Sequence, residues 1–153
     1  MTLLQDIENF QKEIIPKIPQ DVLNTIMRTS AELAERNLEA GALKSGDTIP
    51  SFELTDALGE ARSSDQFLKN GSLVISFYRG GWCPYCHLEL RALQKVLPEI
   101  KASNAMLLAI SPELPNHSLT TREKYELEFP VLSDPNNRVA KKFGLVFEPA
   151  KEL

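Results

Sequence analysis

Short apolar runs that alternate with helical segments constrain the fold of this chain more than any other feature. Three short apolar runs each predict a buried strand: SLVISFY (72–78), which is rich in β-forming residues, AMLLAIS (105–111) and FPVLSD (129–134). A long helix is predicted between the first two runs, from Pro84 to about Lys101, and a shorter helix, TTREKYEL (120–127), before the third. Strands that alternate with helices predict an α/β fold with a largely parallel sheet.

The segments around these runs are assigned from alternation and from turn or cap residues. IPSFELTD (49–56) alternates like a strand and ends at the turn 57–60, and SSDQFL (63–68) predicts a short capped helix. NRVAKKFG (137–144) predicts a helix that ends at Gly144. Thr120 and Glu123 have the spacing of a capping box and predict that the helix before the third run begins there.

The first 40 residues predict two helices. Leu3, Leu4, Ile7, Phe10, Ile14 and Ile15 recur at helical spacing until Pro16 and Pro19 interrupt them, and a second apolar series continues to about Gly41. We interpret residues 1–43 as an N-terminal helical arm for packing or dimerisation. Residues 44–153 then form the α/β domain.

Composition excludes several classes of function. The chain has 153 residues, a net charge of −4 and no basic block, which argues against binding to nucleic acid or to an anionic membrane surface. No apolar run reaches the ~18 residues of a membrane span. Its first residues lack the pattern of a secretion signal, so the expected location is cytoplasmic. A structural disulfide is disfavoured there, whereas a catalytic or metal-binding thiol pair is favoured.

Both cysteines lie in RGGWCPYCHLELRAL (79–93), where a buried strand meets a helix. The first turn of a helix has unpaired N–H groups and the positive end of the macrodipole, and both lower the pKa of a cysteine placed there. Pro84 fits the first helical position, and Cys86 follows one turn after Cys83, near enough for a disulfide. Trp82 is expected to shield the pair with its apolar face.

Two metal interpretations compete with a redox pair. Cys83, Cys86 and His87 match the C-x-x-C-H spacing of covalent haem attachment, but that motif is not expected after a buried strand. Zinc needs four ligands, and the chain offers two cysteines and two histidines, His87 and His117. We interpret His87 as a polar residue on the exposed side of the helix and His117 as a solvated loop residue. No metal or cofactor is therefore predicted.

At this point the chain resembles a known group. GDTIPSFELTDALGE (46–60), LVISFYRGGWCPYCHLELRAL (73–93), LLAISPE (107–113) and FPVLSDPNNRVAKKFGL (129–145) are similar to the peroxiredoxin-like branch of the alkyl hydroperoxide reductase/thiol-specific antioxidant (AhpC/TSA) family. The resemblance implies a thioredoxin-like fold and the reduction of hydroperoxides or disulfides through cysteine. It also implies recharging by a thiol donor such as thioredoxin or glutathione.

The resemblance leaves the roles of the two cysteines open. Peroxiredoxins carry P-x-x-x-T-x-x-C after a Phe-Tyr pair, and laid on Phe77 and Tyr78 this pattern makes Cys86 the attacking residue, with Arg79 and Cys83 at the Pro and Thr positions. Laid on a thioredoxin Trp-Cys-x-x-Cys, the pattern makes Cys83 the exposed attacking thiol and Cys86 the resolving one. Arg79 is either a stabiliser of the thiolate or of a peroxide oxygen, or a surface arginine.

Family members continue beyond FGLVF into further strands and a closing helix. The expectation is therefore a C-terminally truncated thioredoxin-like domain that leaves the strand at 72–78 on an open edge, covered in a homo-oligomer. The leading hypothesis is a thiol peroxidase that cycles between a dithiol and a Cys83–Cys86 disulfide, with Tyr78, Arg79, Trp82 and Pro84 in support. The alternatives are a thiol-disulfide oxidoreductase and a non-catalytic redox-sensing subunit.

Overall fold

The computed structural model describes residues 2–149, and their internal contacts divide the chain into two units. We call Pro50–Ala140 the sheet unit, and Met1–Ile49 with Lys141–Leu153 the arm unit. The boundary between residues 43 and 44 stays a prediction. No helix within residues 2–149 combines the length and apolar character needed to span a bilayer.

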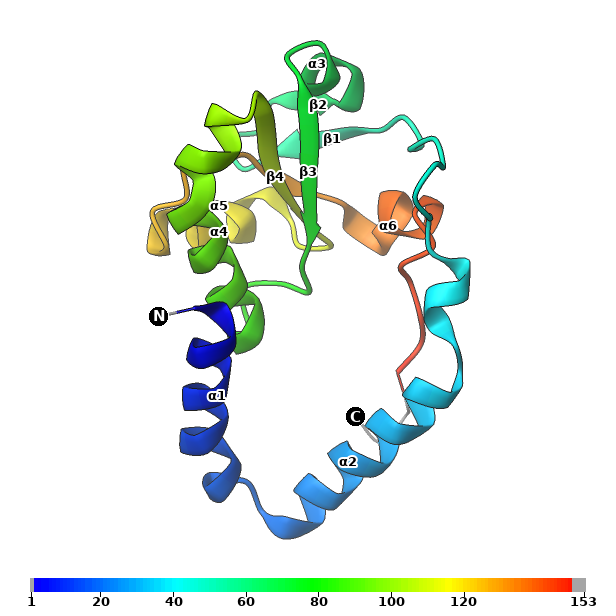
Figure 1. Cartoon of the computed structure of the whole chain (residues 1–153), viewed down its shortest axis with the longest axis vertical. Coiled ribbons are helices and arrows are strands. Elements are labelled where there is room, and N and C mark those ends of the chain that lie inside the picture. Colours follow the sequence, from blue (N-terminus) through cyan, green and yellow to red (C-terminus); the bar gives the residue numbers. More distant parts are fainter. Residues whose placement is uncertain (1, 150–153) are drawn as a thin grey trace. The chain divides into compact units, whose positions relative to one another are not determined.

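The sheet unit is built on five strands in the order β2-β1-β5-β4-β3. Figure 1 shows β3 and β4 side by side. The strands are β1 (Glu53–Asp56), β2 (Ala61–Ser63), β3 (Ser72–Phe77), β4 (Ala105–Ser111) and β5 (Val131–Ser133). The pairs β3–β4 and β4–β5 are parallel, but β1 runs antiparallel to both β5 and β2. The prediction of a largely parallel sheet was therefore wrong for β1 and β2. The turn at 57–60 folds β2 back onto β1 as a hairpin, and β1 runs opposite to β5. β3 lies at an edge, as predicted.

Helices connect the strands at the places that the sequence pattern indicates. They are α3 (Ser64–Leu68), α4 (Pro84–Ala102), α5 (Pro115–Lys124) and α6 (Arg138–Lys142), with the short 3-10 helix η3 (Pro135–Asn137) before α6. The side chain of Ser63 caps α3 in a capping box with Gln66, which confirms the predicted cap. The capping box predicted at Thr120 was wrong. α5 begins at Pro115, a residue suited to a first turn, and the Thr120 hydroxyl donates to the carbonyl of Asn116 inside the helix.

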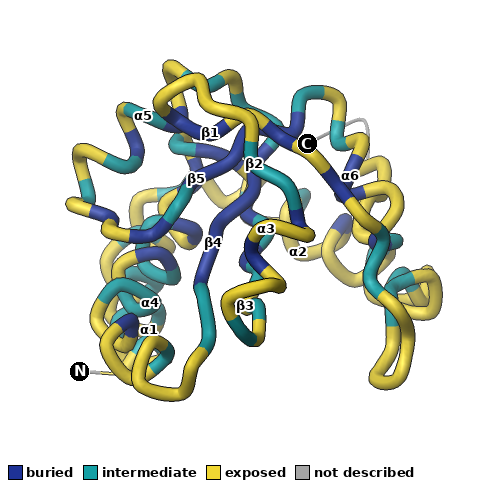
Figure 2. The backbone as a smooth tube through the Cα atoms, turned by 90° about the horizontal axis from the view of Figure 1, so that it is seen from above, coloured by how far each residue is buried: buried dark blue, intermediate teal, exposed yellow. Residues whose placement is uncertain are grey.

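The core of the sheet unit lies between α4 and the central strands. Leu90 and Leu97 of α4 pack in one cluster with Leu107 and Ala109 of β4, and both cysteines belong to this cluster. Figure 2 shows burial concentrated on β4 and β5, where the Cα tube is mostly dark blue. The cysteine pair therefore belongs to the buried core of the sheet unit.

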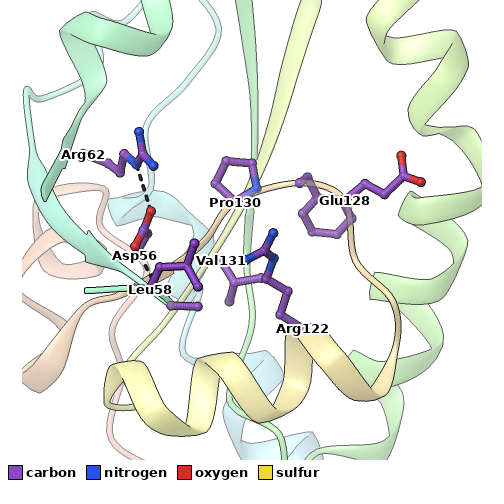
Figure 3. A pocket seen from close by; sticks show the side chains of 9 residues that line it. Asp56, Leu58, Arg62, Arg122, Glu128, Pro130 and Val131 are labelled. Carbon is purple, nitrogen blue, oxygen red and sulfur yellow. Dashed lines mark hydrogen bonds and ion pairs between the residues drawn. The ribbon is translucent and has the colours of Figure 1, made fainter. Parts of the chain in front are cut away.

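A single carboxylate organises the β1–β2 hairpin. Asp56 accepts hydrogen bonds from the backbone N–H groups of Leu58 and Glu60, at 2.9 and 3.0 Å, and from Nε of Arg62 at 2.8 Å. Asp56, Arg62 and Arg122 line a hollow of about 110 Å³. Figure 3 shows their side chains around it. The residues that line this hollow include no cysteine, and nothing in it bears on the thiol pair.

The arm unit contains two helices, as predicted. These are α1 (Leu3–Ile14) and α2 (Gln20–Glu35), each followed by a short 3-10 helix, η1 (Ile15–Lys17) and η2 (Leu38–Gly41). The segment after α6 lies against this unit's own chain, because Leu43 N–H donates to the carbonyl of Phe143 at 3.2 Å. Gly144 has a φ of 71°, and a Cβ there would lie 1.8 Å from the carbonyl oxygen of Gly41. Only glycine allows the two segments to approach so closely.

Candidate thiol site

The loop between β3 and α4 carries the two cysteines to the start of the helix. Cys83 is the N-cap residue of α4, and its sulfur accepts a hydrogen bond from the N–H of Cys86 at 3.4 Å. Pro84 occupies the first helical position, as predicted, where its missing N–H costs nothing. A thiol sulfur therefore takes the place that a serine or aspartate oxygen usually has at a helix N-terminus.

The two thiols lie in direct contact. Both cysteines are free, and the S–H of Cys86 donates to the sulfur of Cys83 across 2.6 Å. Cys83 is 0% exposed and Cys86 8% exposed. The expectation that Cys83 faces solvent was therefore wrong, because this side chain packs in the core cluster with residues such as Tyr78 and Leu90.

The surroundings separate the pKa values of the two thiols. Burial alone raises the pKa of Cys83, but hydrogen bonds from Cys86 S–H, Cys86 N–H and Arg79 outweigh burial and bring this pKa below its ordinary value. Burial raises the pKa of Cys86, and so does its role as hydrogen-bond donor to Cys83. The thiolate form is therefore favoured at Cys83 and the neutral thiol at Cys86. An attacking and a resolving cysteine need this difference in pKa.

Arg79 interacts with the sulfur rather than lying free on the surface. Its Nη2 donates to the sulfur of Cys83 at 3.1 Å, a charge-assisted bond once that sulfur is a thiolate. The guanidinium carbon also lies 5.1 Å from the centre of the Trp82 ring, a cation–π contact. Trp82 is itself 66% exposed, and the contact of its ring is with Arg79. That its apolar face shields the two cysteines stays a prediction.

Tyr78 is a buried residue that packs in the core with the thiol pair. It is 4% exposed. Burial raises the pKa of its phenol, so the group stays neutral. The nearby hydroxyl groups of Ser111, Ser118 and Thr121 act in the opposite direction on this pKa but do not offset the effect of burial. Among the residues that the structure describes, none of these groups makes a hydrogen bond of good geometry with the buried Tyr78 oxygen.

Sequence reasoning missed three residues that hold the cysteine loop: Glu113, His87 and Tyr125. Glu113 accepts a hydrogen bond from the N–H of Gly81 at 2.9 Å. His87 contacts the carbonyl of Gly81 through Nε2 at 2.6 Å and the Tyr125 hydroxyl through Nδ1 at 2.7 Å. The interpretation of His87 as an exposed polar residue was therefore wrong, because the loop folds back over the first turn of α4.

The paired glycines were the sequence signal that pointed to this contact. A Cβ at Gly80, where φ is 142°, would lie 2.7 Å from Nε1 of Trp82. A Cβ at Gly81 would lie 2.6 Å from the Thr121 hydroxyl. Gly80 therefore leaves room for the Trp82 ring, and Gly81 allows a close approach of the loop to Thr121 of α5. The sequence did not indicate which side chains contact the loop there.

The arrangement around the thiols does not form a metal site. Across residues 2–149, no group of three or more His, Cys, Asp or Glu side chains is placed to hold a metal ion. His117 is exposed on α5, which corrects its assignment to a loop. The residues that meet at the cysteines are instead suited to thiol chemistry, with a cation and a second thiol at one sulfur.

Comparison with known proteins gives a consistent family signal. The model of the AhpC/TSA family matches residues 45–152. "Putative peroxiredoxin bcp" of Buchnera aphidicola is 36% identical over 103 residues, covering 67% of this chain and 65% of that protein. "Peroxiredoxin Bcp" of Escherichia coli is 31% identical over 103 residues, with the same two coverages of 67% and 65%. The chain therefore spans 65% of the length of these curated relatives.

Solved structures give the same result for the fold. The crystal structure of Peroxidoxin BcpB from Mycobacterium tuberculosis matches with a TM-score of 0.65 at 30% identity, covering 67% of this chain and 66% of that one. Peroxiredoxin Q of Xanthomonas campestris matches with a TM-score of 0.61 at 23% identity, over 65% of this chain and 63% of that one. The thioredoxin-like α/β fold predicted for residues after the helical arm is thereby confirmed.

Proposed function

The chain belongs to the AhpC/TSA family, and from this membership we propose that it is a thiol-dependent peroxidase in which Cys83 attacks and Cys86 resolves. The observation that carries the assignment of roles is the set of three donors at the Cys83 sulfur: Arg79, the N–H of Cys86 and the S–H of Cys86. A sulfur that accepts three hydrogen bonds is favoured as a thiolate.

The proposed reaction has three balanced steps. The Cys83 thiolate attacks one oxygen of a hydroperoxide, the O–O bond breaks, and the leaving alkoxide or hydroxide takes a proton, which leaves a sulfenic acid. The Cys86 thiol then displaces water from this sulfenic acid, and a Cys83–Cys86 disulfide forms. A dithiol donor such as thioredoxin, or two molecules of glutathione, reduces the disulfide and becomes oxidised in turn. In the first step Arg79 stabilises the thiolate and the peroxide oxygen that gains charge.

A matched pair of serine variants tests this assignment. The reduced protein receives one equivalent of hydrogen peroxide, and mass spectrometry with a sulfenic-acid trap follows the products. We expect the wild type to lose two hydrogens, Cys86→Ser to trap a sulfenic acid on Cys83, and Cys83→Ser to react slowly. Rapid sulfenic acid formation on Cys86 in Cys83→Ser would reverse the roles. Full turnover in both variants would refute the mechanism.

A second candidate function rests on the same sulfur pair. Cys83 stands at the start of a helix with Cys86 one turn later, a geometry that also suits exchange with a disulfide substrate. Slow oxidation by peroxide together with fast reaction with glutathione disulfide would favour this thiol-disulfide oxidoreductase. Inertness toward both oxidants would instead favour a non-catalytic, redox-sensing subunit.

The setting of the reaction is part of the proposal. We place the protein in the reducing cytoplasm, where structural disulfides are rare and a cysteine pair is more often catalytic. Thioredoxin or glutathione would be available there as the reductant. We also propose a homo-oligomer, supported by the edge position of β3.

A further inference from the structure

The backbone N–H and C=O of Gly81 are both held by residues that belong to other elements. Its N–H donates to the carboxylate of Glu113, which follows β4, across 2.9 Å. Its carbonyl accepts from Nε2 of His87, on α4, across 2.6 Å. The His87 ring is fixed in turn by the Tyr125 hydroxyl at 2.7 Å and by stacking, with ring centroids 4.7 Å apart. We call Glu113, His87 and Tyr125 the Gly81 clamp.

The chemistry of the partners determines the tautomer of His87. A backbone carbonyl only accepts hydrogen bonds, so Nε2 must carry the proton that is donated to Gly81. In the neutral ring Nδ1 then accepts from the Tyr125 hydroxyl. The two contacts together fix the orientation of the His87 ring between Gly81 and Tyr125.

The clamped loop contains two residues without side chains. Gly80 and Gly81 have no side chains to pack, and glycine samples more backbone conformations than other residues. This loop connects Arg79, which donates to the sulfur of Cys83, to Cys83 itself. The side-chain hydrogen bonds to Gly81 come from Glu113 and His87, and Tyr125 holds the His87 ring.

We infer that Glu113 and His87 are positioning residues for the attacking thiol. Their hydrogen bonds to the backbone of Gly81 hold the loop in the conformation in which Arg79 reaches the Cys83 sulfur. Tyr125 acts through His87 by holding its ring. The inference rests on the proposed function in one respect, since it concerns the sulfur to which we assign the attack. It extends that function with three residues that touch neither sulfur.

The thiolate itself provides the test. In a Cys86→Ser background Cys83 is the one remaining thiol, and thiolate absorbance near 240 nm measures its ionisation against pH without any peroxide. His87→Phe keeps an aromatic ring beside Tyr125 but loses both hydrogen bonds. We expect it to lower the thiolate fraction at neutral pH by roughly threefold, the value of about one hydrogen bond. Tyr125→Phe should lower this fraction less, and His117→Phe, on exposed α5, should leave it unchanged.

Two substitutions at Glu113 isolate the hydrogen bond from the charge. Glu113→Ala and Glu113→Gln remove the same negative charge, but the amide oxygen of glutamine still accepts from Gly81. The alanine variant should therefore show less thiolate than the glutamine variant. Equal thiolate fractions in the two variants would contradict a positioning role for Glu113.

A double-mutant comparison with Arg79 decides whether the clamp acts through this residue. If it does, His87→Phe should change the thiolate fraction little once Arg79 is methionine. An equal fall in the presence and absence of Arg79 would overturn the inference, and so would an unchanged fraction in His87→Phe or, if that variant does not fold, in Tyr125→Phe. A failed peroxide assay with the expected titrations would refute the proposed function alone.

Discussion

At the residue scale, the reactivity of the thiol pair depends on one guanidinium group. Arg79 donates to the sulfur of Cys83 at 3.1 Å and helps to hold the pKa of this thiol below its ordinary value. Arg79→Met should raise this pKa and slow alkylation of Cys83 at neutral pH by about tenfold, because a charge-assisted bond to the thiolate is lost. The measurement is the alkylation rate across pH in a Cys86→Ser background.

The sign of the pH dependence follows from the lowered pKa. Only the thiolate reacts, so the rate rises as pH increases through the pKa of Cys83, and the Arg79→Met profile should lie at higher pH than its parent. Arg91→Met is a suitable control, because Arg91 is an exposed arginine on the same helix. An identical shift in both variants would mean that general charge, rather than the bond to sulfur, sets the pKa.

At this scale the sequence predicted residues whose position follows from local geometry. The two cysteines and Pro84 could be placed at the start of α4 because helix termini have fixed requirements for donors and dihedral angles. Glu113 and Tyr125 could not, since their contacts join segments far apart in the chain. Glu113 lies 32 positions from the glycine that it holds, and Tyr125 lies 38 positions from His87. The contact between His87 and Gly81 spans only six positions, but it depends on the path of the loop, which helical periodicity does not predict. Burial of Cys83 was missed because it depends on packing against distant residues such as Leu107 and Phe129.

At the scale of single elements, the β1–β2 hairpin depends on Asp56. Burial raises the pKa of its carboxyl, but the hydrogen bonds from Glu60 N–H, Arg62 and Leu58 N–H lower this pKa by more than burial raises it. The pKa of Asp56 therefore lies below its usual value. Asp56→Asn removes the charge that all three donors face. We expect it to lower the free energy of unfolding at pH 7 by about 1–3 kcal/mol, measured by urea denaturation.

The same carboxylate gives a pH dependence of defined sign. Because its pKa is lower in the folded state, its contribution is fully present above the unfolded pKa and is lost as pH falls through the folded pKa, which means below about pH 4. Wild type should lose this contribution on acidification, whereas Asp56→Asn should lack that part of the decrease. Glu53→Gln, at an exposed carboxylate on the same strand, is the control and should keep the wild-type acid transition.

In the arm unit, Gly144 gives a second test at the level of single elements. Gly144→Ala places a methyl group against the carbonyl of Gly41 and also strains a backbone with a φ of 71°. Gly46 has a φ of 95° but open space around it, so Gly46→Ala carries the strain without the clash. We expect Gly46→Ala to cost about 1–2 kcal/mol and Gly144→Ala clearly more. Thermal unfolding of both variants measures the difference, and equal costs would exclude the clash.

Element positions were more predictable than element directions. The strands at β3, β4 and β5 and the long helix α4 follow from apolar runs and periodicity, which are local properties. The antiparallel direction of β1 against β5 depends on pairing between residues such as Thr55 and Ser133, far apart in the sequence. The start of α5 was also missed, because two plausible starts, Pro115 and Thr120, lie within six residues of one another.

At the scale of the whole molecule, the sequence predicted both the fold class and the edge position of β3. Among residues 2–149, β3 pairs with one strand, β4, and its other side has no strand beside it. Val74 on this strand is 39% exposed. Unpaired backbone groups on an apolar strand favour pairing with another chain. We therefore expect the protein to self-associate through the β3 edge as its concentration rises.

Val74→Lys should oppose this association, because a lysine on an edge strand resists the approach of a second strand. Sedimentation velocity over a range of concentrations measures the change, and we expect the variant to stay monomeric where the wild type associates. Val96→Lys is a matched control: Val96 is 40% exposed, but it lies on α4, away from any strand edge. If both lysines weaken association equally, added charge is the cause, and if neither does, the contact between copies lies elsewhere than on β3.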